Sequence, residues 1–241
     1  MGVCLVVGAG DGVGGAIAKA FAKDGLEVCV TRRARNLEQL EALAQSIRDD
    51  GGKAQAYGVD ARSEEEMISL VDQIEAEIGP LEVVVFNIGA NVRFDLTETT
   101  SRVFHKVWEM ACFSGFLTAR EAARVMLPRG RGTILLTGAT ASVRGRQGFS
   151  AFSAAKHGLR AVAQSAAREL GPQGIHVAHV VVDGAIDGVF ARTNIPDREA
   201  RLESDGILKP EEIARNYVWL HNQQRSAWTH ELDLRPWAEA W

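Results

Sequence analysis

A glycine-rich segment near the start of the chain has the spacing of a phosphate-binding turn. It follows the continuous apolar run Val3–Val7, which predicts a strand buried on both faces, and it precedes an amphipathic helix ending near Lys23. A turn there leaves amide groups free at a helix N-terminus, where pyrophosphate is favoured. Two registers fit, G-x-G-x-x-G at Gly10, Gly12 and Gly15 and G-x-x-x-G-x-G at Gly8, Gly12 and Gly14. Because the strand ends at Val7, we favour the second register; a purely structural turn is the alternative interpretation.

Arginine residues follow the second predicted strand, Glu27–Thr31. The sequence continues as Arg32-Arg33-Ala34-Arg35, without an acidic residue. In a dinucleotide site a carboxylate at this place favours a free 2′-hydroxyl, whereas arginine accommodates a 2′-phosphate. We therefore expect Arg32 and Arg33 to favour NADP(H) over NAD(H). Asp11 in the glycine turn argues in the opposite direction, and a solvated basic loop is the alternative interpretation.

Further motifs follow the glycine turn in order along the chain. They are Asp60 after the third predicted strand, Asn87 and Gly89 in Phe86–Gly89 after the fourth, Lys156 in Phe152–Lys156, Gly184 after Val182 and Asp183, and Lys209–Ala214. Together with the second glycine register, they resemble the short-chain dehydrogenase/reductase family over nearly the whole chain. The resemblance implies that Asp60 contacts the adenine and that Lys156 reaches the nicotinamide ribose. The cofactor contacts that we expect in all are Gly8, Gly12, Val13, Gly14, Arg32, Arg33, Asp60, Asn87, Gly89, Lys156, Gly184 and Ile186.

The catalytic residues of that family are mostly replaced in this chain. Phe152 stands at the position of the tyrosine acid/base, Ala139 at the position of the serine, and Ala111 at the position of the asparagine. Only Lys156 is kept, four residues after Phe152 and therefore on the same helix face. A positioned general acid contributes ~10²–10⁴-fold to a rate, and phenylalanine offers neither a proton nor a hydrogen bond. The pattern resembles an atypical subgroup of the family in which Phe replaces Tyr and the nearby Lys remains.

Other polar groups near these positions are candidates for supplying a proton. Thr140 and Ser142 follow Ala139, although Ser142 is better explained as a local cap of its loop. Asp183 replaces a proline close to the expected nicotinamide, where partial burial would raise its pKa and make it an acid. The alternative interpretation is that Asp183 fixes the turn after the sixth strand.

The two tyrosines of the chain, Tyr57 and Tyr217, do not match the catalytic position. Asn91 and Arg93, after the fourth strand, are candidates for lining the substrate opening, or are simply solvated.

These features favour one function and leave two alternatives open. The leading hypothesis is an NADP(H)-dependent oxidoreductase with altered proton supply, acting on imine or iminium substrates or on activated carbonyls and enones, because hydride transfer to an iminium ion needs no acid. The first alternative is a non-catalytic NADP(H)-binding sensor or scaffold. The weaker alternative is a lyase or isomerase without net hydride transfer.

The elements that must position these residues alternate between strands and helices. This alternation predicts one doubly wound Rossmann-type α/β domain over residues 1–241, with a parallel sheet of about seven strands and helices on both faces. The remaining predicted strands are Lys53–Val59, Leu81–Phe86, Thr133–Thr137, Ile175–Val182 and a weak one near Trp228–Leu234. Helices are predicted near 100–127, 150–170 and 210–220, and capping boxes at Asn36/Gln39 and Ser63/Glu66. Residues 187–209 lack strong periodicity and are predicted to form a loop over the site.

Composition excludes several classes of function. The chain has 241 residues, 46% of them hydrophobic, and a net charge of −4, which gives no electrostatic reason to bind nucleic acid or an acidic membrane. Three widely spaced cysteines fit a reducing compartment, and no metal site is predicted. With no signal peptide and no long apolar run, we expect a cytoplasmic protein acting on a small molecule.

The resemblance also implies a homodimer or homotetramer that pairs through the helices at 100–127 and 150–170. The aromatic tail formed by Trp228, Trp237 and Trp241 either covers a neighbouring subunit or packs within its own chain.

Overall fold

The sheet is the centre of the molecule. The computed structural model describes residues 2–238, so Met1 and Trp241 lie outside the described residues. Within that part, seven strands form one sheet in the order β3-β2-β1-β4-β5-β6-β7, and every neighbouring pair is parallel. The strands are β1 (Val3–Val7), β2 (Glu27–Arg32), β3 (Lys53–Gly58), β4 (Leu81–Phe86), β5 (Gly132–Thr137), β6 (Ile175–Val182) and β7 (Glu231–Leu234).

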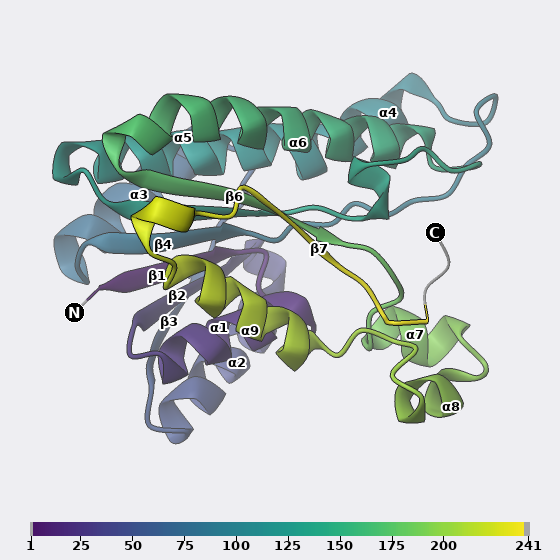
Figure 1. Ribbon diagram of the computed structural model, residues 1–241, viewed down its shortest axis with the longest axis horizontal. Helices are drawn as coiled ribbons and strands as arrows, with labels where there is room; N and C mark the ends of the chain where they lie inside the picture. Colours follow the sequence, from purple (N-terminus) through teal and green to yellow (C-terminus); the bar gives the residue numbers. More distant parts are fainter. Residues whose placement is uncertain (1, 239–241) are drawn as a thin grey trace.

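Helices cover both faces of this sheet (Figure 1). One face carries α3 (Glu64–Glu77), α5 (Ser114–Met126) and α6 (Ser150–Leu170), and the other carries α1 (Val13–Lys23), α2 (Leu37–Asp49) and α9 (Pro210–His221). The remaining α-helices are α4 (Ser101–Trp108), α7 (Val189–Asn194) and α8 (Arg198–Glu203). This is the predicted Rossmann-type α/β architecture.

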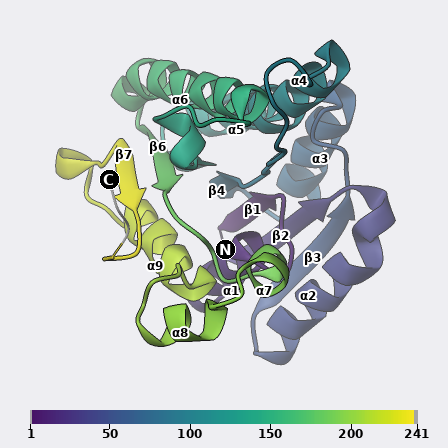
Figure 2. The same cartoon turned by 90° about the vertical axis from the view of Figure 1, so that its right-hand side faces the viewer.

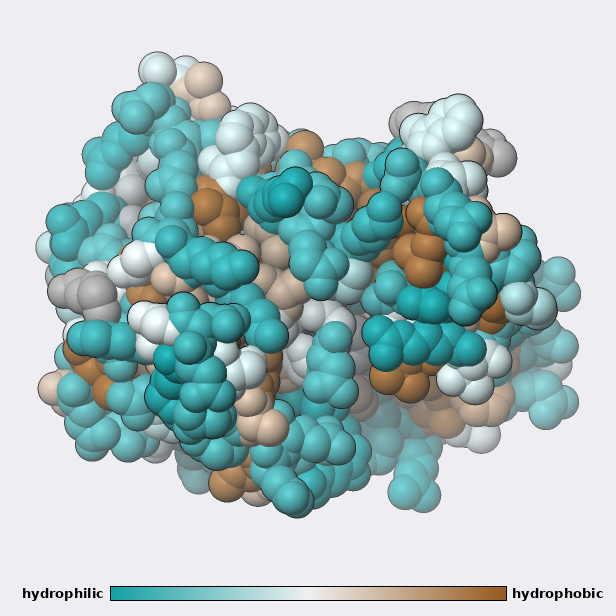
Figure 3. Space-filling model, turned by 90° about the horizontal axis from the view of Figure 1, so that it is seen from below, coloured by the Kyte–Doolittle hydropathy of each residue, from teal (hydrophilic) through white to brown (hydrophobic). Residues whose placement is uncertain are grey.

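The two hydrophobic cores follow from the alternation of side chains along the strands. On β1, Val3, Leu5 and Val7 pack toward α3, α5 and α6, while Cys4 and Val6 pack toward α1, α2 and α9. Because both faces of β1 are covered, this strand consists of continuous apolar residues. Viewed from the side of α1, α2 and α9, the outer surface is mostly hydrophilic with small scattered hydrophobic groups (Figure 3).

Four local predictions need correction. Asn36 caps no described amide with its side chain, because a 3₁₀ turn (η1, Ala34–Asn36) precedes α2 and Gln39 accepts a hydrogen bond from Arg32 instead. Ser63 does cap α3, but the Glu66 carboxylate binds the Asp60 amide rather than closing the predicted box.

Residues 187–209 are not a plain loop, since α7 and α8 form within them. The long helix near 100–127 is interrupted by a π-helical turn (η2, Glu109–Phe113) between α4 and α5.

The carboxyl ends of all seven strands lie at one edge, which faces the viewer in Figure 2. From β1 the chain proceeds through β2 to β3 at one edge of the sheet. It then returns to β4, on the other side of β1, and proceeds through β5 and β6 to β7 at the opposite edge, so the direction of the strand order reverses between β1 and β4. In open parallel sheets, ligands bind at such a switch point, outside the carboxyl ends of the strands.

Candidate functional site

The glycine turn lies at the switch point between β1 and β4. Gly8 has a φ of +93°, a conformation that glycine adopts without strain. A Cβ on Gly14 would stand 2.5 Å from the Gly8 carbonyl oxygen, so α1 packs against the turn at a distance that only glycine permits. In contrast, a Cβ on Gly12 would meet no described atom within 4 Å. A Cβ on Gly15 would likewise stand 2.2 Å from the Gly10 carbonyl oxygen, so the turn is closely packed underneath and open above in a way that suits a phosphate.

A cavity of about 210 Å³ opens from this turn toward the ends of β2 and β3. Its walls include the turn, the residues after β2 and β3, and the residues after β4. They are Gly8, Thr31, Arg32, Arg33, Asn36, Val59, Asp60, Ala61, Arg62, Asn87, Ile88, Gly89 and Met110. The Asn87 side-chain amide donates to the Gly8 carbonyl at 3.2 Å and so ties the loop after β4 to the glycine turn. Six of the twelve predicted cofactor residues therefore line one cavity, namely Gly8, Arg32, Arg33, Asp60, Asn87 and Gly89.

Arginine side chains lie at the end of this cavity that is formed by the residues after β2 and β3. Arg32 and Arg33 line it, and Arg62 holds both carboxylate oxygens of Asp60, at 2.9 and 2.5 Å. The hydrogen bond from Arg62 lowers the pKa of Asp60. Sequence reasoning missed Arg62, because a single arginine in a loop carries no signal of its own. An anion placed beside the β2 and β3 ends would meet several guanidinium groups.

Lys156 is a deeply buried charged side chain of the site. It is 2% exposed, and its Nζ donates to the Ile88 carbonyl at 3.0 Å and to the Thr137 carbonyl at 2.8 Å. The two carbonyls follow β4 and end β5, so the lysine spans the loops that border the cavity. Burial lowers the pKa of Lys156 to about 8. The ammonium has three protons, and two of them are used by these contacts.

The three residues at the family's catalytic positions fall into one apolar group. Phe152 and Ala111 belong to a buried cluster, and Ala139 packs against it. We call this group the Phe152 cluster; its further buried members are Ala90, Val107, Cys112, Ala141, Ala151 and Ala155. Ala111 lies within the π-helical turn η2, the kind of irregularity often found at functional sites. The cluster can exclude water from the site. Apart from the Cys112 thiol, whose pKa is raised by burial, its side chains are hydrocarbon and offer no proton.

The polar candidates Thr140 and Asp183 contact each other beside this cluster. The Thr140 hydroxyl donates to Asp183 Oδ1 at 2.5 Å, and Arg144 Nη2 donates to both Asp183 oxygens, at 3.1 and 3.2 Å. Arg235 lies 3.5 Å from Asp183 Oδ2. The carboxylate is 1% exposed and compensated by two arginines, which favours a fixing role for Asp183 over that of an acid.

Other candidate residues have structural partners. Ser142 Oγ accepts from the Ala139 amide at 3.1 Å, as expected of a loop cap. The Tyr217 hydroxyl bonds to Thr137 Oγ1 at 2.7 Å in the fully buried layer under α9. Burial raises the pKa of both Tyr57 and Tyr217 above the usual range. Neither phenol borders the Phe152 cluster.

The loop after β6 brings the C-terminal segment toward the same edge. Gly184 has a φ of +155°, and a Cβ there would lie 2.7 Å from Pro236. Ile186 forms an isolated parallel bridge with Leu208, which closes the base of the α7–α8 segment. Gly184 and Ile186 therefore follow the carboxyl end of β6, although neither lines the described cavity.

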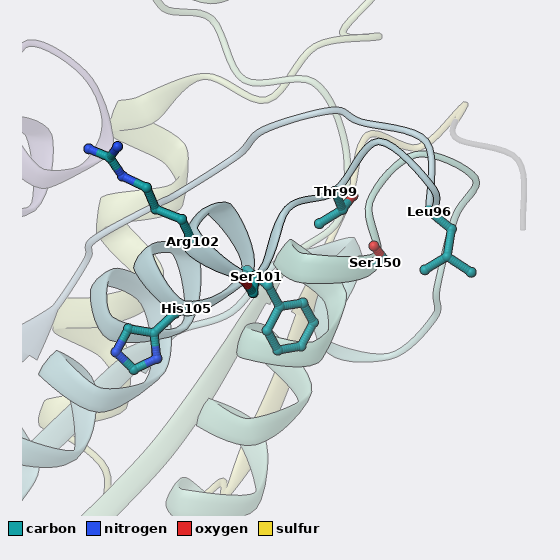
Figure 4. Close-up of a pocket in the computed structure, with 7 residues that line it drawn as sticks. Leu96, Thr99, Ser101, Arg102, His105 and Ser150 are labelled. Carbon is teal, nitrogen blue, oxygen red and sulfur yellow. The ribbon is translucent and has the colours of Figure 1, made fainter.

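A larger open hollow of about 780 Å³ lies elsewhere, at the starts of α4 and α6 (Figure 4). Its walls are Leu96, Thr99, Ser101, Arg102, Phe104, His105 and Ser150. It contains none of the predicted cofactor residues, so we do not assign it to the site.

Two features are absent from the described residues. No cluster of three or more potential ligand side chains suited to a metal ion is found in residues 2–238. None of the helices in that part of the chain is long and apolar enough to cross a membrane.

Comparisons with known proteins agree with this geometry. The sequence profile described as short chain dehydrogenase matches residues 2–199. A crystal structure of a short-chain dehydrogenase from Rhodopseudomonas palustris is 46% identical, with a TM-score of 0.84, over 98% of this chain and 99% of that one. A single-residue variant of the actinorhodin polyketide ketoreductase with NADPH is 25% identical, with a TM-score of 0.87, over 98% and 96% of the two chains. A short-chain dehydrogenase/reductase of Armillaria gallica is 32% identical, over 73% of this chain and 67% of its own length.

Proposed function

Because the chain belongs to the short-chain dehydrogenase/reductase family, we propose that it is an NADP(H)-dependent oxidoreductase whose active site lacks a tyrosine acid. One observation carries the proposal. The cofactor-orienting Lys156 is kept, buried and bonded to the loops after β4 and β5, while Phe152, Ala139 and Ala111 join a single apolar cluster beside it. A cofactor site is thus combined with a substrate site that has no proton donor at the usual place.

The residues around the 210 Å³ cavity suit a dinucleotide phosphate. The open space above Gly12 and the first amides of α1 would take the pyrophosphate. Arg32 and Arg33 would bind a 2′-phosphate, because guanidinium groups form strong charge-assisted hydrogen bonds with phosphate. Asn87 would hold the glycine turn in shape, and the remaining proton of Lys156 would bind the ribose.

The preference for NADPH gives a first prediction. Replacing Arg33 with alanine should weaken NADPH binding by about tenfold or more, since hydrogen bonds to charged groups contribute ~1.5–3 kcal/mol. NADH binding should change little. Nicotinamide fluorescence titration measures both dissociation constants, and Arg35→Ala is the matched control, because Arg35 is exposed in the same loop and does not line the cavity. Equal loss of affinity for both cofactors would contradict the assignment.

When bound, the reduced nicotinamide supplies a hydride. Addition of a hydride to a ketone creates an alkoxide that needs a proton, and the Phe152 cluster has no hydroxyl to supply it. Addition to an iminium ion, R₂C=NR₂⁺, forms a C–H bond while the C–N π electrons become the nitrogen lone pair, which leaves a neutral amine. The site's own residues then need only to orient the cofactor through Lys156 and keep water out through Phe152. We therefore propose iminium ions, with activated enones next, as substrates.

A substrate panel tests this proposal. Protein shown to bind NADPH is mixed with cyclic iminium salts, activated enones and simple ketones, and nicotinamide absorbance is followed. Faster oxidation with iminium salts than with ketones supports the proposal. The joint loss of three catalytic polar residues favours one competing function, a non-catalytic NADP(H) sensor. If NADPH is oxidised no faster than free cofactor with any of the three substrate classes, the result favours the sensor. Product formation without cofactor oxidation would indicate a lyase or isomerase.

An exposed aromatic row supports the proposed homodimer or homotetramer. Trp108 stacks on Phe113 at 5.7 Å, Phe113 on Phe116 at 6.3 Å, and the Arg120 guanidinium lies 5.6 Å from the Phe116 ring. Trp108 is 37% and Phe116 41% exposed, on the outer side of α4 and α5. Contiguous exposed aromatic groups of this kind mark protein–protein contacts.

A second prediction follows from this aromatic row. A Trp108→Glu/Phe116→Glu variant should be monomeric in multi-angle light scattering at concentrations where the natural chain is a dimer or tetramer. A charge buried in an apolar interface is costly. Phe190→Glu is the control, because Phe190 is 69% exposed on α7, away from this row. A natural chain that is itself monomeric at high concentration would contradict the proposed assembly.

A further inference from the structure

Three arginines lie on the loops that contribute side chains to the Phe152 cluster. Arg144 is the innermost of them, and its Nη2 atom is held by both oxygens of the buried Asp183. Its side chain is still 41% exposed, and the hydrogen bonds found within residues 2–238 do not use its Nε and Nη1 donors. Asp183 thus fixes one end of the guanidinium group and leaves the other end available to a ligand.

Arg93 and Arg146 lie on the two loops next to Arg144. The loops are joined by a hydrogen bond from the Phe94 amide to the Gly148 carbonyl at 2.9 Å. They also touch through the Arg93 side chain, since a Cβ on Gly148 would stand 2.9 Å from Arg93 Cγ. Within residues 2–238, neither Arg93 nor Arg146 forms an ion pair. Unpaired arginines on adjacent loops are notable in a chain whose net charge is −4.

The same loops contribute apolar side chains to the site. Val92 precedes Arg93, Ala141 precedes Arg144 by one helical turn, and Phe149 follows Arg146 on the same loop; all three pack in or against the Phe152 cluster. A molecule resting on this cluster would therefore have a hydrophobic surface beneath it and guanidinium groups at its edge. This combination suits an apolar body that carries a negative charge at one end.

On the basis of the proposed function, we infer that the substrate is an iminium ion or enone whose apolar body also carries an anionic group, a carboxylate or a phosphate, bound by Arg144. The planar fork of arginine matches both groups with paired hydrogen bonds. Arg93 and Arg146 attract the anion to the opening. Asp183 acts as a positioning residue for Arg144, which gives its burial beside the site a purpose other than proton donation.

The inference is tested by ligand binding, without need of the true substrate. ¹⁹F NMR titrations of NADPH-saturated protein would use 4-(trifluoromethyl)benzoate, the corresponding phenyl phosphate, and 4-(trifluoromethyl)benzamide as the neutral analogue. We expect at least one anion to bind about tenfold or more tightly than the amide, because hydrogen bonds to charged groups are strong. In the Arg144→Gln variant we expect this difference in affinity to disappear. Comparison of the two anions identifies which group the site prefers.

Two further variants guard against effects on folding. Arg93→Gln/Arg146→Gln breaks no ion pair of the described chain and should weaken the anion by a few fold. Arg131→Gln, which removes a surface pair with Glu82, should have no effect. The inference is overturned if amide and anions bind alike, or if neither the Arg144 variant nor the double variant weakens the anion. NADPH binding is measured separately by nicotinamide fluorescence, so failure of the cofactor proposal is recognised before the anions are added.

Discussion

A Phe152→Tyr/Ala139→Ser variant is expected to reduce simple ketones at least ~100-fold faster than the natural chain, because a positioned general acid contributes ~10²–10⁴-fold. Phe152 and Lys156 lie four residues apart on α6, so a tyrosine hydroxyl at 152 would extend from the helix face that carries the ammonium. A nearby positive charge favours the phenolate and makes the phenol a better acid. The serine would add a hydrogen-bond donor for the developing alkoxide. Steady-state oxidation of NADPH with a ketone measures the gain.

The first control lies outside the cluster. Phe104→Tyr adds a hydroxyl to an exposed residue of α4 that does not belong to the Phe152 cluster, and it should leave ketone reduction unchanged. The two single variants should each give less than the double variant, since tyrosine and serine act as a unit. Unaltered ketone reduction in a double variant that binds NADPH normally would show that the missing hydroxyls are not what limits the reaction.

Replacing Lys156 with methionine is expected to lower kcat/KM for NADPH oxidation by about 100-fold, because misplacement of a bound group by ~1 Å alone costs that much. The ammonium links Ile88 and Thr137, at 3.0 and 2.8 Å, and its loss frees both loops at the proposed ribose site. Lys53→Met, at an exposed position on β3, is the control. A Lys156→Met variant with unchanged NADPH affinity and turnover would remove Lys156 from the site.

The same lysine sets an expected pH dependence. Burial lowers the pKa of Lys156 to about 8, so NADPH affinity should fall as the pH rises through this value, and the methionine variant should show no such fall. Unfolding driven by Lys156 itself cannot explain the loss. Between about 8 and the ordinary lysine value of 10.5, the unfolded chain binds a proton that the folded chain has released, so this group makes folding more favourable as the pH rises.

Much of the fold could be predicted because buried parallel strands have a strong apolar pattern. Val3–Val7, Leu81–Phe86 and Ile175–Val182 have the predicted bounds. The predicted cap at Asn36 was wrong because the preceding 3₁₀ turn displaced it. The short helices between 187 and 209 were missed because they bury few residues and so lack an apolar period.

The candidate site was predictable only where a motif has a fixed register. The glycine turn and Lys156 could be recognised in this way. The contact between Thr140 and Asp183 joins residues 43 positions apart and depends on β5 and β6 being neighbours, which the sequence does not state. Arg144 was missed for a similar reason, because its partner Asp183 lies on the loop after another strand.

The most direct test of the proposed preference for iminium ions is a single-turnover experiment with NADPH that carries deuterium at the transferred position. A preformed cyclic iminium salt and the corresponding cyclic ketone are mixed separately with the NADPH-bound protein, and the products are analysed by mass spectrometry. We expect the amine to contain one deuterium. We expect the ketone to be reduced no faster than by free cofactor. Bound NADPH that transfers no deuterium to the iminium salt, or that reduces the ketone equally fast, would contradict the proposed preference.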